Sequence, residues 1–173
     1  PQEGMPEFGP DGRIYPGTCR HRSLSQARPG DALRLDMRKA VKALQKPVTY
    51  EEFGEQHSKR ITLKAEALIA QVGDVVLRRK DQGAAYHLAV VIDDDAQNIT
   101  DVVRGADLNA ATQIHVVLQQ LLNIPTPRYH HHSLIRDETG KRLAKRSDSE
   151  ALSSLRKAGH SAQDITERLF SAP

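Results

Sequence analysis

A short basic segment, residues 137–146 (DETGKRLAKR), holds the side chains best suited to bind an anion. A glycine turn precedes four cationic residues, which are Lys141, Arg142, Lys145 and Arg146. Cations brought together by a tight turn can converge on a polyanion such as a triphosphate. The alternative is an ordinary hairpin turn followed by a solvated basic run.

Three upstream segments give this loop a context. They read AYHLAVVIDD, VVRGADL and YHHHSLI, and they precede RLAKR in that order. In this order the four segments resemble the second half of a class I glutamyl-type aminoacyl-tRNA synthetase, in which RLAKR is similar to the ATP-binding KMSKS loop. Arg142 replaces the first lysine of that motif, Ala144 replaces its serine and Arg146 ends it, whereas Lys145 is retained.

The resemblance implies an ATP-dependent ligase that activates L-glutamate, with Mg²⁺ accompanying ATP. It assigns ATP binding to Arg142, Leu143 and Lys145, and we expect Lys145 to be catalytic because a fixed cation stabilises charge on the phosphoryl oxygens. It assigns glutamate binding to Tyr86 and Arg104, and a planar guanidinium suits a carboxylate. The alternatives are a salt bridge from Arg104 to Asp107 or Asp101, and core packing for Tyr86.

A second motif, RIYPGTCR, contains Tyr15 and Cys19. In the glutamyl-queuosine tRNA-Asp synthetases a similar YPGTCR follows a C-x-C pair, and the resemblance implies that the two halves hold Zn²⁺. Structural zinc needs four ligands. The C-x-C half is absent from this sequence, so Tyr15 and Cys19 form a half-site at most, and a turn with an incidental cysteine is the simpler interpretation.

Within the resembled family, YPGTC and the early C-terminus favour the glutamyl-queuosine enzymes, which transfer activated glutamate to the queuosine base of tRNA(Asp). One alternative is part of a glutamyl-tRNA synthetase that charges tRNA(Glu). Another is a catalytically incomplete fragment or paralogue that only binds tRNA. The sequence begins at Pro1 and has no HIGH-type motif, so we expect missing upstream sequence.

Composition sets broad limits. The 173 residues are 38% hydrophobic and 27% charged, with a net charge of +3, one cysteine and no apolar run long enough to cross a bilayer. We therefore expect a cytoplasmic protein without membrane contact, and a monomer. Basic residues gather near residues 20–42, 78–80 and 141–146, which predicts either a positive face for tRNA or ordinary solvated surface.

Hydrophobic patterns favour an α/β fold. Short branched runs predict strands at residues 73–79, 86–92, 99–103 and 129–135. Residues 31–44 predict a strand followed by a short irregular or helical piece. Residues 106–122 predict the clearest helix, with His115 as a packed core histidine on its apolar face. Helix capping boxes that begin at Ser147 and Ser161 predict two C-terminal helices.

These elements predict three regions. Residues 1–32 are expected to be a loop-rich remnant of a zinc-binding or insertion region. Residues 33–135 are expected to form half of a Rossmann-type catalytic domain with a connecting insertion. Residues 136–173 are expected to hold the KMSKS-like loop and a small helical region that contacts the tRNA stem.

Overall fold

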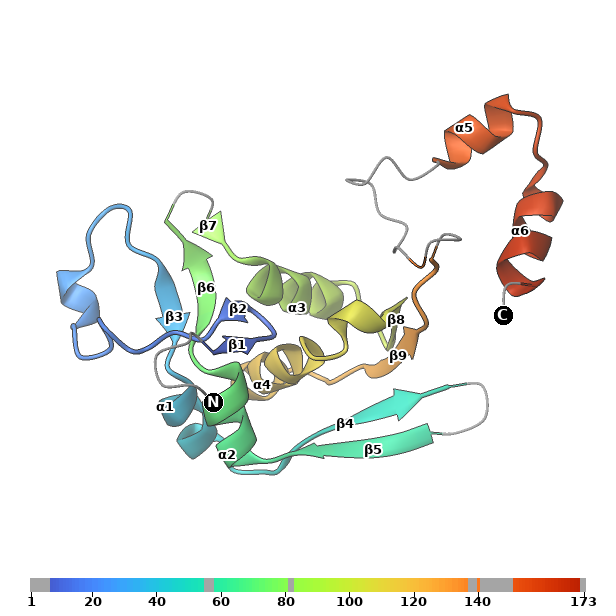
Figure 1. The fold of residues 1–173 in the computed structure, drawn as a ribbon. Coiled ribbons are helices and arrows are strands. Elements are labelled where there is room, and N and C mark those ends of the chain that lie inside the picture. Colours follow the sequence, from blue (N-terminus) through green and yellow to red (C-terminus); the bar gives the residue numbers. More distant parts are fainter. Residues whose placement is uncertain (1–6, 55–57, 81–82, 137–139, 141–150, 172–173) are drawn as a thin grey trace. The chain divides into compact units, whose positions relative to one another are not determined.

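A computed structural model of the chain describes residues 7–54, 58–80, 83–136, 140 and 151–171, with the side chains described as far as residue 167. The chain divides into two compact units, Pro1–His132 and Ser133–Pro173. Figure 1 shows the helices and strands of each unit. Each unit is described by itself.

The main sheet of the first unit has four strands in the order β5-β4-β9-β8. They are β4 (Val48–Phe53), β5 (Ser58–Leu63), β8 (Asp101–Gly105) and β9 (Arg128–His132). β5 pairs antiparallel with β4, whereas β9 runs parallel to both β4 and β8. The carboxyl ends of β4, β9 and β8 therefore lie at one edge of the sheet, where open α/β sheets bind their ligands.

The predicted helix over 106–122 is confirmed, with a break near its start. A 3₁₀ turn, η3 (Ala106–Leu108), leads into α4 (Thr112–Leu122), which connects β8 to β9 and packs on β4. Asn123 ends the helix in the left-handed conformation, with φ of 56°. This cap lets the chain turn back into β9.

The strand predicted over residues 86–92 is wrong, because this segment begins helix α3 (Tyr86–Ala96). Branched residues favoured a strand, but His87 and Val91, four residues apart, are the buried positions. That spacing matches one face of a helix, which packs against α4 and β6. The strand predicted at 99–103 exists two residues later, as β8.

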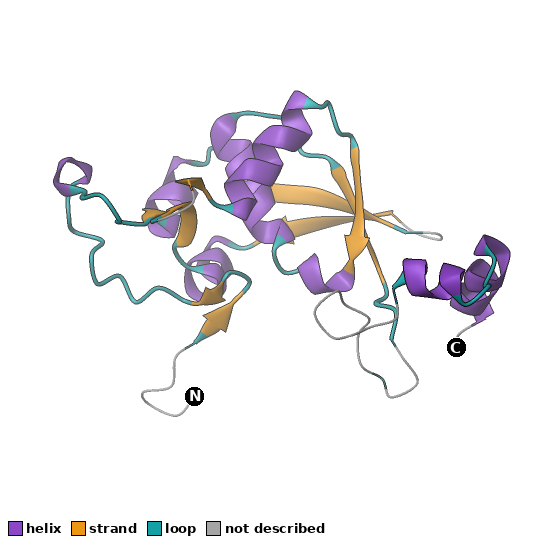
Figure 2. Ribbon diagram, turned by 90° about the horizontal axis from the view of Figure 1, so that it is seen from above, coloured by secondary structure: helices purple, strands orange, loops and turns teal. Residues whose placement is uncertain are grey.

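A second, antiparallel sheet lies in the same unit, in the order β3-β6-β7. Its strands are β3 (Leu33–Leu35), β6 (Val75–Arg79) and β7 (Gly83–Ala84). β3 leads into α1 (Met37–Ala43), so the predicted strand is confirmed, and of the two alternatives for the piece after it the helical one is correct. Figure 2 shows helices packed alongside the strands of the first unit.

The remaining elements of the first unit are short. They are β1 (Phe8–Gly9), β2 (Gly12–Arg13), η1 (Leu24–Gln26), α2 (Ala65–Ala67) and the π-helical turn η2 (Leu68–Val72). β1 and β2 form a hairpin, as the Gly-Pro turn between them predicts.

Asp74 ties the N-terminal segment to the core. It is buried, and its carboxylate accepts hydrogen bonds from Arg20 at 2.8 and 2.9 Å and from the backbone N–H of Met37 at 3.0 Å. Arg20 therefore fixes the segment 1–32, which was expected to be rich in loops, to the core through Asp74.

One apolar core joins the two sheets to α1, α3 and α4. Its largest fully buried apolar side chains are Met37, Leu68, Val75, Val91, Ile114, Val116, Val117 and Tyr129. Burial of this kind is the main favourable contribution to folding. Within the part of the chain that the structure describes, no helix is long and apolar enough to cross a membrane.

The described part of the second unit contains two helices, α5 (Leu152–Lys157) and α6 (Ala162–Ser171). Ser161 and Asp164 form the predicted capping pair of α6, since the Ser161 hydroxyl accepts from the Asp164 N–H at 3.1 Å and the Asp164 carboxylate accepts from the Ser161 N–H at 2.7 Å. Ser147–Glu150, the box predicted for the preceding helix, lies outside the described residues.

Candidate functional site

The candidate site lies at the carboxyl edge of the main sheet. Arg104 on β8 is paired in register with His131 on β9. Glu52 near the end of β4 accepts a hydrogen bond from the backbone N–H of His131 at 3.0 Å. Three adjacent parallel strands thus bring a cation, an imidazole and a carboxylate together at the edge where the fold predicts ligands.

Arg104 is half-buried and held by four hydrogen bonds. Its Nε donates to His131 Nε2 at 3.1 Å and its Nη1 to His115 Nδ1 at 3.1 Å. Its Nη2 donates to the Leu108 carbonyl at 3.2 Å and to the Thr112 hydroxyl at 2.6 Å. These bonds to described residues use four of the five guanidinium N–H groups, so among the described contacts one Nη1 hydrogen is left for a ligand.

A salt bridge to Asp101 was one alternative for Arg104. Asp101 instead pairs with Arg128, at 2.5 Å between carboxylate oxygen and Nη2. The Arg104 guanidinium also lies 5.3 Å from the ring centroid of Tyr129, a cation–π contact with a buried aromatic ring.

His115 is buried in the core, with an exposed fraction of 2%, as predicted from its place on the apolar face of α4. Burial, followed by the positive charge of Arg104 and the neighbouring His87 and His131, lowers its pKa to about 3. His115 is therefore neutral at physiological pH and can accept a hydrogen bond from Arg104. The helical pattern located this histidine but gave no sign of its polar partners.

His131 lies between Arg104 and Glu52 and contacts both. Its side chain is 2% exposed, and its Nδ1 lies 2.9 and 3.0 Å from the two Glu52 carboxylate oxygens. The Thr112 hydroxyl lies 3.1 Å from His131 Nε2, which also accepts from Arg104. A carboxylate behind the imidazole fixes which ring nitrogen carries the proton.

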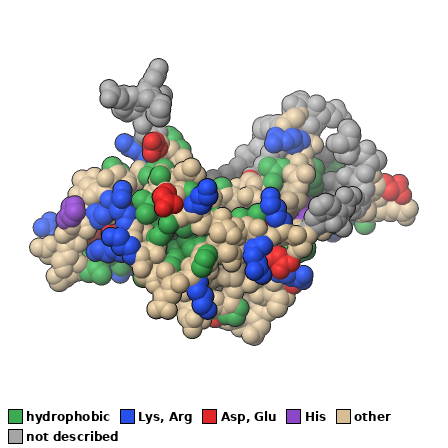
Figure 3. Space-filling model, turned by 90° about the horizontal axis from the view of Figure 1, so that it is seen from below, with side chains coloured by type: hydrophobic (Ala, Val, Ile, Leu, Met, Phe, Trp, Pro, Cys, Tyr) green, Lys and Arg blue, Asp and Glu red, His purple; other side chains and the backbone are tan. Residues whose placement is uncertain are grey.

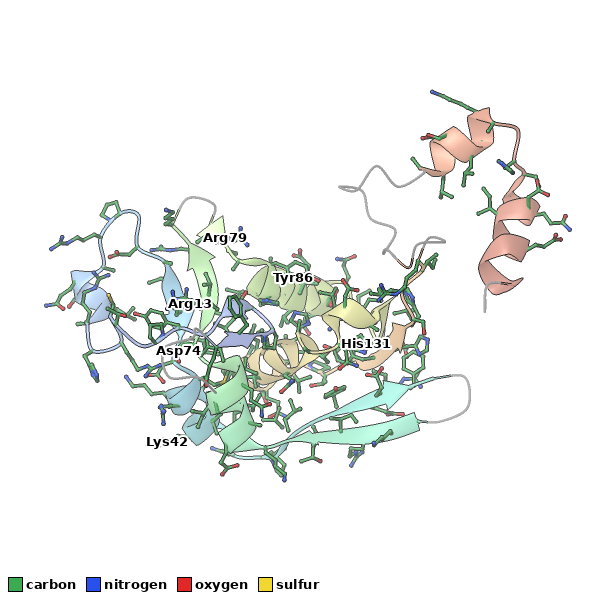
Figure 4. The ribbon with its side chains drawn as sticks, in the orientation of Figure 1. Arg13, Lys42, Asp74, Arg79, Tyr86 and His131 are labelled. Carbon is green, nitrogen blue, oxygen red and sulfur yellow. The ribbon has the colours of Figure 1, made fainter. Side chains whose placement is uncertain are left out.

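Tyr86 stands at the first residue of α3 and is 49% exposed. Its ring centroid lies 5.3 Å from that of His87 and 6.0 Å from that of His115. Tyr86 also lines a surface cavity of about 560 Å³ together with Asp11, Arg79 and Lys80. His115 thus touches both residues that were predicted to bind glutamate. Figure 4 labels Arg79, Tyr86 and His131 on the first unit.

Comparison with known proteins decides the family. The family described as "tRNA synthetases class I (E and Q), catalytic domain" matches residues 32–170. The chain belongs to this family. The α/β fold expected from the sequence, half of a Rossmann-type class I catalytic domain, is confirmed.

Several relatives of this class I synthetase domain carry one name. A glutamyl-Q tRNA(Asp) synthetase of Rhodobacter capsulatus is 51% identical over 95% of this chain, which corresponds to 59% of that protein. A protein of the same name from Albidiferax ferrireducens is 38% identical over 80% of this chain and 48% of its own length. The chain therefore spans about half to three-fifths of the length of these two relatives.

A solved structure is also similar to this class I synthetase domain. It is a glutamate-tRNA synthetase from Elizabethkingia anophelis, which is 24% identical, with a TM-score of 0.43, over 68% of this chain and 21% of its own.

The KMSKS-like loop of this class I synthetase domain lies outside the described residues, apart from Gly140. The predicted roles of Arg142, Leu143 and Lys145 therefore stay predictions. The Gly140 carbonyl accepts a hydrogen bond from Arg136 Nη1 at 2.9 Å.

The predicted zinc half-site, Tyr15 and Cys19, lies in a turn that an internal hydrogen bond closes. The Tyr15 hydroxyl accepts a hydrogen bond from the Cys19 N–H at 2.5 Å, and the Arg34 guanidinium lies 4.7 Å from the Tyr15 ring centroid. Among the described residues, no group of three or more His, Cys, Asp or Glu side chains is arranged to hold a metal. Tyr15 and Cys19 supply two of the four ligands that structural zinc requires, so these residues alone do not fit the ion.

The hydrophobic pattern identified His115 but not the other side chains that bond to Arg104. His87, Asp11 and Glu52 were not predicted to belong to the site. Of the three consecutive histidines, His131 contacts both Arg104 and Glu52. The signal available in the sequence was the presence of histidines inside two apolar segments, which implies polar partners for each.

Proposed function

We propose that this chain is part of an ATP-dependent synthetase that activates L-glutamate and transfers it to the queuosine base of tRNA(Asp). The observation that supports it most is the restrained Arg104 at the carboxyl edge of the parallel strands, in a chain of the class I E and Q family. The curated relatives named glutamyl-Q tRNA(Asp) synthetase support the choice of tRNA.

Arg104 and Tyr86 are the proposed glutamate-binding residues. The remaining Nη1 hydrogen of Arg104 offers one charge-assisted hydrogen bond to a substrate carboxylate. A bidentate grip uses hydrogens on two different guanidinium nitrogens, so it would also require Arg104 to release one bond made by Nε or Nη2. The exposed Tyr86 ring, whose centroid lies 6.0 Å from that of His115, would supply an apolar wall with a polar hydroxyl.

The proposed reaction has two steps. A glutamate carboxylate oxygen attacks the α-phosphorus of ATP and pyrophosphate leaves; a nucleophile of the queuosine base then attacks the activated carbonyl carbon and AMP leaves. Lys145 would stabilise the negative charge that grows on the phosphoryl oxygens, with Arg142 and Leu143 beside the nucleotide. Mg²⁺ would accompany the ATP phosphates and neutralise part of their charge.

Basic surface residues are the proposed contacts to tRNA. Figure 3 shows Lys and Arg side chains in separate groups over the face that it presents. Several early cations are already paired, since Arg20 binds Asp74 and Arg22 binds Asp31. The exposed Lys39, Lys42 and Lys80 are better placed to meet phosphates. We further propose that the protein acts in the cytoplasm as a monomer.

Two assays on the complete protein test this function. Glutamate-dependent exchange between ATP and pyrophosphate, in the absence of tRNA, tests activation. Transfer of labelled glutamate is then compared among queuosine-containing tRNA(Asp), tRNA(Asp) lacking queuosine and tRNA(Glu). Transfer to the first alone is the expected result. Charging of tRNA(Glu) would favour a glutamyl-tRNA synthetase, and tRNA binding without exchange would favour an incomplete or RNA-binding protein.

A further inference from the structure

A chain of hydrogen bonds runs from Arg104 to the N-terminal hairpin. Arg104 Nη1 lies 3.1 Å from His115 Nδ1, and His115 Nε2 lies 3.0 Å from His87 Nδ1. His87 Nε2 then lies 3.3 Å from the Asp11 carboxylate, in the turn between β1 and β2. Three elements far from Asp11 in the sequence, α3, β8 and α4, are thereby connected to it.

The direction of every bond in this chain is fixed by Arg104. A guanidinium can only donate, so His115 Nδ1 must accept and the His115 proton resides on Nε2. His115 Nε2 then donates to His87 Nδ1, which leaves the His87 proton on Nε2, where it faces the Asp11 carboxylate. Both rings are neutral in this arrangement, and each of their nitrogens has a partner.

None of the four acceptors that hold Arg104 is a carboxylate. They are two imidazole nitrogens, a hydroxyl and a backbone carbonyl. The nearest acids along each path, Asp11 and Glu52, are each separated from Arg104 by imidazole groups. Neutral acceptors orient a guanidinium without forming a direct ion pair, so these bonds do not neutralise the positive charge of Arg104. The charge also acts on the Asp94 carboxyl, where it opposes the rise in pKa that burial causes.

Packing alone does not account for these side chains. His115 is 2% exposed and His87 8% exposed, and burying polar rings costs free energy that apolar residues of similar size would not incur. Asp11 is less enclosed, with a side chain 29% exposed, and it also accepts a hydrogen bond from the Val76 N–H at 3.3 Å. Asp11, at the outer end of this series of hydrogen bonds, can therefore be substituted without creating a cavity in the core.

We propose that His115, His87 and Asp11 are positioning residues for glutamate binding, which hold the Arg104 guanidinium in one orientation through two imidazole groups so that its charge can meet the substrate carboxylate. This inference rests on the proposed function. It assigns the N-terminal hairpin, through Asp11, a part in the affinity for glutamate.

The kinetic test uses the complete protein and measures the KM of glutamate and of ATP separately in pyrophosphate exchange. His115→Phe should raise the glutamate KM about 10-fold or more, because a buried donor of Arg104 loses its acceptor. Asp11→Ala should raise it about 3-fold, and Asp11→Asn should recover most of that loss because its amide oxygen still accepts. The ATP KM should change less than about 2-fold in each variant, since a positioning role affects the glutamate subsite.

Asp31→Ala is the matched control. Asp31 is another carboxylate of the N-terminal segment, and it pairs with Arg22 rather than with a histidine. If Asp11→Ala changes the glutamate KM no more than Asp31→Ala does, the proposed role of the hairpin is overturned. Equal rises in the KM of glutamate and ATP would indicate general damage and would overturn it as well.

A spectroscopic test separates this inference from the proposed function. Nitrogen-15 NMR of the unmodified protein should show His115 and His87 as neutral rings protonated at Nε2. Protonation of His115 at Nδ1 would overturn the inference even in a fully active enzyme. If the unmodified protein shows no glutamate-dependent exchange, the proposed function fails and positioning for glutamate fails with it, whatever the tautomers are.

Discussion

Acidification should destabilise the first unit through His115. The folded protein holds the pKa of this histidine at about 3, chiefly because the side chain is buried, against an ordinary value of 6.5. Below pH 6.5 the unfolded chain therefore binds a proton at His115 that the folded protein does not bind. The contribution of neutral His115 to the free energy of unfolding is fully present above pH 6.5, and it is lost progressively as the pH falls toward 3.

The magnitude follows from the two pKa values. Each pH unit below the unfolded pKa costs about 1.4 kcal/mol, so moving from pH 7 to pH 5 should remove about 2 kcal/mol of unfolding free energy. A change of this size is a substantial fraction of the stability of an ordinary domain.

Urea unfolding at pH 7 and pH 5 would measure this loss. Circular dichroism is a suitable signal because the sequence contains no tryptophan. The variant His115→Gln lacks the titrating group, so the pH-dependent loss in the unmodified protein should exceed that in the variant by about 2 kcal/mol. His21→Gln, at an exposed histidine, serves as the control and should behave like the unmodified protein. Equal losses in the unmodified protein and His115→Gln would refute the reasoning.

Three further substitutions test the site and the fold. Arg104→Lys should raise the glutamate KM by about 100-fold, because a lysine ammonium cannot reproduce the guanidinium fork that bonds to three side chains and a carbonyl; steady-state exchange kinetics would show it. Lys145→Ala should abolish exchange while circular dichroism shows an intact fold, and retained exchange would exclude Lys145 as the catalytic residue. Asp74→Ala should lower the free energy of unfolding by about 2–4 kcal/mol, because it leaves Arg20 and the Met37 N–H unpaired; a urea midpoint equal to that of the unmodified protein would contradict this.

Elements with a clear periodic pattern were predictable from the sequence. The helix over 106–122, the strand ending at Arg79 and the strand beginning near Tyr129 all follow from local hydrophobic spacing and turn residues. The capping pair at Ser161 located the start of α6 for the same reason, because both partners lie within four residues.

The segment 86–92 shows where local patterns fail. Its branched residues suit a strand, and only the burial of His87 and Val91 against α4 and β6 selects a helix. The preference of branched residues for strands is weak and depends on the surroundings, so tertiary packing decides such a segment.

The polar arrangement around Arg104 was beyond sequence reasoning for a different reason. Glu52 and His131 are 79 residues apart, and they meet because β9 is inserted between β4 and β8. Strand order is a property of the whole sheet, which a single sequence does not reveal. A histidine in an apolar run signals that a partner exists, and the fold alone identifies that partner.

The parallel ladder between β8 and β9 constrains how this domain can change in length. It places Arg104 opposite His131 and Val103 opposite His130. Inserting or deleting one residue in the connection over 106–127 would tend to slip the ladder by one, which turns the His131 side chain to the other face of the sheet and removes the acceptor of Arg104 Nε. Length variants between these strands should therefore be tolerated only where the added or lost residues leave the ladder unshifted.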